Sequence, residues 1–66
     1  MENLIEVIHE SLVNGQRQQM VNQIEEYGLY DFWKDYLEYL ENMYSLFGVH
    51  NYFTDATISY FRIKNR

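Results

Sequence analysis

Few side chains in this 66-residue chain have the types and spacing that catalysis requires. The two histidines, His9 and His50, are the only candidates for an imidazole base, and none of the three serines has the sequence context of an activated nucleophile. His9 borders the apolar face of a predicted helix and His50 lies in a predicted turn, so we expect both to be surface or helix-capping histidines. The sequence therefore predicts a protein that is not an enzyme and has no catalytic residues.

The residues that could bind a metal or a cofactor are equally sparse. His9 lies near Glu6 and Glu10, but this arrangement lacks the paired histidines of the HExxH zinc motif, and the chain has no cysteine. Neighbouring carboxylates at residues 25–26 and 35–38 are common on solvated helices and indicate catalysis only within a pocket. The sequence contains no glycine-rich phosphate loop. We therefore predict no metal site and no cofactor.

The strongest structural signal is residues 31–47, DFWKDYLEYLENMYSLF. Wound at about 100° per residue, this stretch separates into an apolar arc about 180° wide and a polar arc that holds all its charged residues. The arc indicates a helix, and it is wider than the stripe of about 100° on an ordinary surface helix. We expect Trp33 to be buried within it, so that truncation to alanine would cost about 3–5 kcal/mol. We also expect several elements to cover the arc, or neighbouring helices together with a second copy of the chain in a homodimer.

Three glycines divide a chain without proline into four predicted helices. Gly15, Gly28 and Gly48 each follow an apolar-periodic segment, where glycine commonly ends a helix in the left-handed conformation. The fold class is therefore all-α, a compact bundle of four short helices around a central aromatic-rich helix. The predicted helices span residues 2–13, 16–27, 31–47 and 51–66.

The last of these segments also fits a strand. Its run TISYFRI, residues 57–63, is rich in β-branched and aromatic side chains. A strand there would have no partner within the chain and would need a second subunit, so we favour a helix. Asp31 and Asn51 are the predicted side-chain N-caps of the third and fourth helices.

Length and composition predict one small domain, residues 1–66. A domain of about 60 residues buries only about 60% of its unfolded surface, which makes stability marginal. Aromatic residues make up 18% of the chain and provide large rings for a core that no disulfide can brace. No apolar run reaches the roughly 20 residues of a membrane span, and the acidic start MENLIEVIHE lacks the basic region of a signal peptide. We therefore expect no membrane partner and no secretion signal.

The charge distribution favours a basic partner. Residues 1–55 hold all ten acidic residues and only two basic ones, Arg17 and Lys34, whereas residues 56–66 hold three basic residues and no acid. An acidic body attracts basic proteins and repels nucleic acid. Arg17 shares the apolar face of the second predicted helix. We favour the interpretation that its stem covers the edge of the core, and an ion pair with an acid of another helix or subunit is the alternative.

The candidate protein-binding residues are acids on the polar faces of the first and third predicted helices, with two tyrosines at one side of the apolar arc. They are Glu6, Glu10, Glu38, Glu41, Tyr36 and Tyr39. Tyrosine is enriched at protein interfaces. The alternative function, which we rank lower, is a nucleic-acid-binding accessory protein that uses the basic tail residues Arg62, Lys64 and Arg66. Salt-dependent retention on DNA separates the two, because phosphate contacts weaken steeply with salt.

Three stretches, NGQRQQM, YGLYDFW and ISYFRIKNR, resemble small uncharacterised proteins encoded by bacteriophages and other mobile elements. The similarity covers most of the chain and implies no catalytic residues. It implies a cytoplasmic location in a bacterial host cell, where small acidic proteins often inhibit host or defence proteins, sometimes by imitating nucleic acid. On that implication, the expected partner is a basic or nucleic-acid-binding protein.

Overall fold

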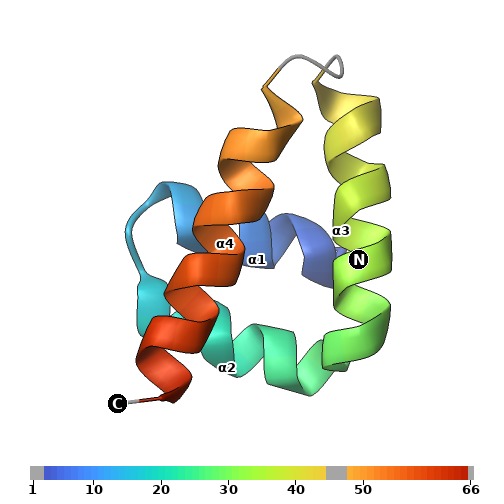
Figure 1. The fold of residues 1–66 in the computed structure, drawn as a ribbon. Helices are drawn as coiled ribbons and strands as arrows, with labels where there is room; N and C mark the ends of the chain where they lie inside the picture. Colours follow the sequence, from blue (N-terminus) through green and yellow to red (C-terminus); the bar gives the residue numbers. More distant parts are fainter. Residues whose placement is uncertain (1–2, 45–47, 66) are drawn as a thin grey trace.

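Four helices make up the fold in the computed structural model, which describes residues 3–44 and 48–65 (Figure 1). They are α1 (Leu4–Val13), α2 (Arg17–Tyr27), α3 (Leu29–Met43) and α4 (Val49–Lys64). The described residues contain no strand, so the all-α prediction is confirmed and the ambiguous last segment is a helix. None of these four helices combines the length and the hydropathy that crossing a lipid bilayer requires.

α3 and α4 run in opposite directions and form the near side of the bundle in Figure 1, with α1 and α2 lying across them behind. α2 contacts each of the other three helices, and α1 packs on both α2 and α3. The wide apolar arc of α3 therefore packs on α1, α2 and α4, and Trp33 and Leu37 at one edge of it stay only partly buried.

The core is centred on Phe32 and Tyr36 of α3, both of which are fully buried. Their rings stack with centroids 4.9 Å apart, and Phe32 also meets Tyr27 of α2 edge-on at 6.4 Å. Because the three remaining helices all add apolar side chains around this pair, the core depends on the whole chain. These side chains are Ile5, Ile8, Leu12, Met20, Val21, Ile24, Val49, Ala56 and Tyr60.

Trp33 is only partly buried, so the prediction that it lies buried within the core is wrong. Its indole packs edge-on against Phe32 at 4.7 Å, against Phe53 at 5.5 Å and against Tyr60 at 6.1 Å. Phe53 and Tyr60 belong to α4, so the indole packs beside that helix, and part of it stays at the surface. The periodicity of α3 identified the apolar arc correctly, but the side of the arc that is buried most deeply lies at Phe32 and Tyr36.

Glycines, and not the predicted side-chain caps, begin α3 and α4. Gly28, at φ +107°, ends α2 and also starts α3, and Gly48, at φ +111°, precedes α4. Asp31 and Asn51 therefore lie inside the first turns, and no side-chain hydrogen bond caps either helix. The two cap predictions are wrong because each helix begins directly after a glycine with positive φ, two residues before the predicted cap.

The other predicted helix ends lie within a few residues of the observed ones. α1 begins at Leu4, two residues later than predicted, and the side-chain oxygen of its N-cap Asn3 accepts a hydrogen bond from the Ile5 amide at 2.9 Å. α3 ends at Met43, because Tyr44 has an extended backbone, whereas the predicted helix continued to residue 47. Residues 45–47 lie outside the described part of the chain.

Replacing Gly28 with alanine is expected to destabilise the protein by about 1–3 kcal/mol, because an L side chain at this φ is strained. Steric contact is not the cause, since the nearest atom to an added Cβ would be Asp31 Oδ2 at 4.0 Å. Urea denaturation measures the change. Gln19→Ala, at an exposed position in α2, is the matched control and should shift stability by less than about 0.5 kcal/mol. Equal stability of the two variants would contradict the prediction.

An ion pair joins α2 to α4. The Arg17 guanidinium lies 3.2 Å from the Asp55 carboxylate and also donates to the Leu12 carbonyl at 2.7 Å. The favoured interpretation, that the Arg17 stem merely covers the core edge, is therefore incomplete, and the alternative of an ion pair with another helix is the one observed. Sequence alone could not select this pair, because the two residues are 38 positions apart in the chain and meet only in the folded bundle.

Candidate functional site

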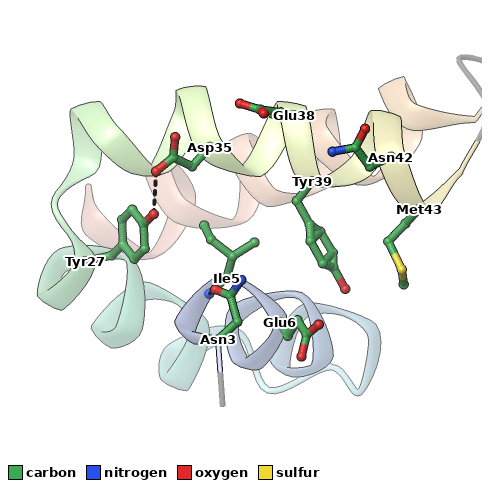
Figure 2. A pocket seen from close by; sticks show the side chains of 9 residues that line it. All are labelled: Asn3, Ile5, Glu6, Tyr27, Asp35, Glu38, Tyr39, Asn42 and Met43. Atoms are coloured by element: carbon green, nitrogen blue, oxygen red, sulfur yellow. Dashed lines mark hydrogen bonds between the residues drawn. The ribbon is translucent and has the colours of Figure 1, made fainter. Parts of the chain in front are cut away.

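The main functional candidate is an open groove of about 520 Å³ between α1 and α3 (Figure 2). One wall comes from the start of α1 and the other from the length of α3, and Tyr27 at the end of α2 closes one end. The lining residues are Asn3, Ile5, Glu6, Tyr27, Asp35, Glu38, Tyr39, Asn42 and Met43. We call this surface the acidic groove, because its lining contains three carboxylates and no basic residue.

Two of its three carboxylates are exposed at the rims. Glu6 on α1 and Glu38 on α3 are both exposed, and Figure 2 shows Glu38 on the edge of α3 that is turned away from α1. The third, Asp35, is partly buried and accepts a hydrogen bond from the Tyr27 hydroxyl at 2.5 Å. That hydrogen bond, with smaller effects of burial and of nearby acids, raises the pKa of Tyr27 to about 12. Tyr27 therefore holds Asp35 in place, and Glu6 and Glu38 are left to contact a ligand.

The sequence-predicted contact residues divide into those that belong to this groove and those that do not. Glu6, Glu38 and Tyr39 line it together. Glu10 lies one turn along α1, close enough that its charge, like that of Glu6, adds to burial in raising the pKa of Tyr39. Glu41 is exposed on α3 but is not part of the lining. The groove thus collects three of the predicted residues from two helices.

Tyr36 is not a contact residue, and that prediction is wrong. Its side chain is fully buried and stacks on Phe32. Tyr36 and Tyr39 occupy neighbouring positions on the same side of the arc. Tyr36 is completely covered, whereas Tyr39 is only partly buried. Helical winding gives the direction of a side chain and not the depth of its cover, so it could not distinguish the two.

A histidine surrounded by tyrosines lies behind the acidic groove, and we call it the His9 cluster: His9, Tyr36, Tyr39, Tyr44 and Tyr52. His9 Nδ1 lies 2.9 Å from the Tyr36 hydroxyl and Nε2 lies 3.0 Å from the Tyr44 hydroxyl. The rings of Tyr39 and Tyr52 approach the imidazole at 5.7 and 5.1 Å. The expectation of a surface or capping histidine is wrong, because only 5% of His9 is exposed.

His9 and Tyr36, at the centre of the His9 cluster, are both neutral at pH 7. Burial lowers the pKa of His9, and the nearby Glu10 charge opposes this only in part. Burial also raises the pKa of Tyr36, so its phenol stays protonated. A neutral imidazole has one N–H donor and one acceptor nitrogen, and the two tyrosine hydroxyls satisfy both. The cluster therefore links α1 to α3. Both ring nitrogens of His9 are occupied by hydrogen bonds, so neither is available for proton transfer to a ligand in the groove.

The sequence offered one weak signal for this cluster. His9 follows the buried Ile8 directly and sits beside the apolar face of α1, in a chain with seven tyrosines. Its hydroxyl partners are 27 and 35 residues away, so pairing them requires the tertiary structure.

The two basic tail residues that the structure describes, Arg62 and Lys64, have different surroundings. Arg62 is exposed on α4, whereas Lys64 donates to the Glu25 carboxylate of α2 at 2.8 Å. Arg66 lies outside the described residues. Within residues 3–44 and 48–65, no three histidine or acidic side chains form a cluster that could hold a metal ion.

Comparison with known proteins gives no protein family, no curated protein and no solved structure that matches this chain. The resemblance to proteins of bacteriophages and mobile elements therefore stays a prediction, and the functional argument depends on the acidic groove itself.

Proposed function

We propose that this protein is a binding module without enzymatic activity, and that it engages a basic surface of another protein through the acidic groove. The observation that supports this most directly is that the exposed Glu6 and Glu38 line one groove with Tyr39, and that this lining contains no cation. Exposed carboxylates attract lysine and arginine side chains and accelerate their approach, while a tyrosine ring supplies apolar contact area and a hydroxyl. A protruding basic segment of the partner is the expected occupant.

The resemblance to phage and mobile-element proteins suggests the biological setting. In that setting the protein is an inhibitor or modulator of a host or defence protein in the bacterial cytoplasm, and its partner is basic or itself binds nucleic acid. The acidic body then occupies the surface where phosphates would bind, because the chain carries a net charge of −5. A second copy of the chain is a further proposed partner, since the outer side of α3 keeps a large aromatic side chain exposed at Tyr30.

Nucleic-acid binding through the C-terminal residues has weaker support. Of the three basic residues proposed for it, Lys64 already forms an ion pair with Glu25, which reduces the charge available to phosphates. We therefore keep it as the alternative, with retention on DNA at low salt and release at higher salt as its signature.

Charge reversal in the groove should slow association with the partner. The partner is first captured from a bacterial lysate and identified by mass spectrometry, and its association rate is then measured by surface plasmon resonance. The double variant Glu6→Lys with Glu38→Lys is expected to lower the rate constant roughly tenfold or more at low salt, because steering by the groove is lost. Circular dichroism should show retained helicity, since exposed substitutions usually change stability by about 0.5 kcal/mol.

The control must separate groove charge from net charge. Glu26→Lys changes the charge of the protein by the same amount as Glu38→Lys, but at an exposed position of α2 that does not line the groove. We expect Glu38→Lys alone to slow association several-fold and Glu26→Lys to leave it nearly unchanged. Equal effects of the two would show that only net charge matters, and an unchanged rate in the double variant would refute the groove.

A further inference from the structure

The side of α3 that faces away from the acidic groove carries a second, chemically different surface. It consists of Tyr30, Trp33, Lys34, Leu37 and Glu41, which we call the outer stripe. Winding α3 at about 100° per residue from Trp33 places the other four within about the next 100°. Tyr30 is 93% exposed, Lys34 and Glu41 are exposed, and Trp33 and Leu37 are only partly buried. The stripe thus combines uncovered aromatic and aliphatic surface with one charge of each sign.

The spacing of the outer stripe is that of a helix that packs against another helix. Tyr30 and Leu37 are seven residues apart with Trp33 between them, which is the a–d–a spacing of a heptad. With Tyr30 at an a position and Trp33 at a d position, Lys34 and Glu41 both occupy e positions, which flank the apolar seam and are also seven residues apart. An antiparallel copy of α3 brings such flanking positions opposite each other.

Charge complementarity identifies that second helix as α3 of another copy. Lys34 lies three residues before Leu37 and Glu41 lies four residues after it. A two-fold axis beside Leu37 is therefore nearly equidistant from the two. It therefore places Lys34 of each copy opposite Glu41 of the other, which makes two intermolecular ion pairs. A basic partner, by contrast, would be repelled by Lys34 at the outer stripe, whereas the lining of the acidic groove contains no cation.

The state of Lys34 in the single chain agrees with this pairing. The acidic part of the chain, residues 1–55, has two cations, and Arg17 is already paired with Asp55. Lys34 forms no ion pair with any described residue, although Asp31 and Glu38 lie one turn away on the same helix. Copies with a net charge of −5 repel each other, so a surface for self-association must contribute opposite charges, as this one does.

The shape of the surface is consistent with an incoming side chain. An open hollow of about 520 Å³ lies at the first half of the stripe, lined by Tyr30, Asp31, Trp33 and Lys34. In the two-fold arrangement, the turn around Glu41 of the second copy faces this hollow. The apolar surface also continues onto α4, because Trp33 packs on Tyr60 and Tyr60 on the exposed Phe61.

We propose that the outer stripe of α3 is the interface of a symmetric antiparallel homodimer, in which Lys34 of each copy pairs with Glu41 of the other. This inference rests on the proposed association with a second copy and is independent of the acidic groove, which lies on the other side of α3. The contact area is that of one helix face, so the dimer belongs to the small, micromolar class of interfaces.

Sedimentation velocity from about 10 µM to 1 mM tests the assignment, a range chosen for a micromolar dissociation constant. The wild-type mass should rise from 8.1 kDa toward twice that value. Lys34→Glu or Glu41→Lys alone replaces both ion pairs with like charges, so each should raise the dissociation constant at least about tenfold. Glu26→Lys, on α2, has the same charge change as Glu41→Lys and should leave the dimer intact.

Mixing the two single variants is the sharpest test. In a mixed dimer of Lys34→Glu with Glu41→Lys, both contacts are again between opposite charges, so an equimolar mixture should dimerise about as strongly as wild type. Failure of the mixture, or single variants that dimerise like wild type, would overturn the interface while leaving self-association in place. A wild-type mass of 8.1 kDa throughout the range would refute self-association itself.

Discussion

Replacing Phe32 with alanine is expected to lower the free energy of unfolding by about 3–5 kcal/mol, the usual cost of truncating a buried large aromatic side chain. Phe32 is fully buried and is contacted by the rings of Tyr27, Trp33 and Tyr36. Its removal leaves a cavity at the point where α2 and α3 meet the rest of the core. Urea denaturation followed by circular dichroism measures the loss.

The comparison with Trp33 makes this prediction specific. Trp33→Ala should cost less than Phe32→Ala, although it removes more atoms, because the indole is only partly buried. If Phe32→Ala does not fold, Phe32→Leu and Trp33→Leu provide the same ranking with smaller losses, since a leucine retains part of the packing. A larger loss at Trp33 than at Phe32 would show that α3 is rotated relative to the structure described here.

A second large effect is expected from pH. The folded protein should lose stability as the pH falls below about 6.5, the ordinary pKa of histidine in an unfolded chain. Burial lowers the pKa of His9 in the folded state, so below pH 6.5 the unfolded chain binds a proton that the folded chain still excludes. The loss continues down to the folded-state pKa, with a slope of at most about 1.4 kcal/mol per pH unit for one proton.

The groups around His9 set the size of this effect. On α1 the Glu10 charge favours protonation. Burial of His9 opposes it, among the rings of Tyr36, Tyr39 and Tyr44, from α3 and its C-cap, and of Tyr52 from α4. A protonated imidazole donates from both nitrogens, so the tyrosine hydroxyl that donated to His9 loses its acceptor. That hydroxyl must turn and accept instead, and the main cost of protonation in the folded state is the burial of a charge.

His9→Gln isolates the contribution of this one group. Glutamine offers an amide donor and a carbonyl acceptor to the two hydroxyls but does not titrate. Its unfolding free energy should change less than that of wild type between pH 7.5 and 5.5, a window about one unit either side of the histidine pKa. His50→Gln removes the other imidazole, which is exposed, and should keep the wild-type profile. Parallel profiles for wild type and His9→Gln would exclude His9 as the cause.

The sequence by itself determined the helices, because helix formation depends mainly on local sequence patterns. Apolar residues at helical spacing and glycines at the ends of periodic segments predicted all four, and the glycines have the positive φ values expected of them. The same local reasoning failed at the starts of α3 and α4, where Gly28 and Gly48 occupy the N-cap positions in place of the predicted caps Asp31 and Asn51.

Only the tertiary structure decided which side of each helix is buried most deeply and which distant residues meet. The apolar arc of α3 contained Trp33, Tyr36 and Tyr39 alike, and the placement of α1, α2 and α4 left Tyr36 covered and the other two at the edges. The same placement paired His9 with Tyr36 and Tyr44, and put Glu6 and Glu38 in the lining of one groove. These residues lie 27 to 35 positions apart, and helical periodicity carries no information over such distances, because only packing between helices selects which faces meet.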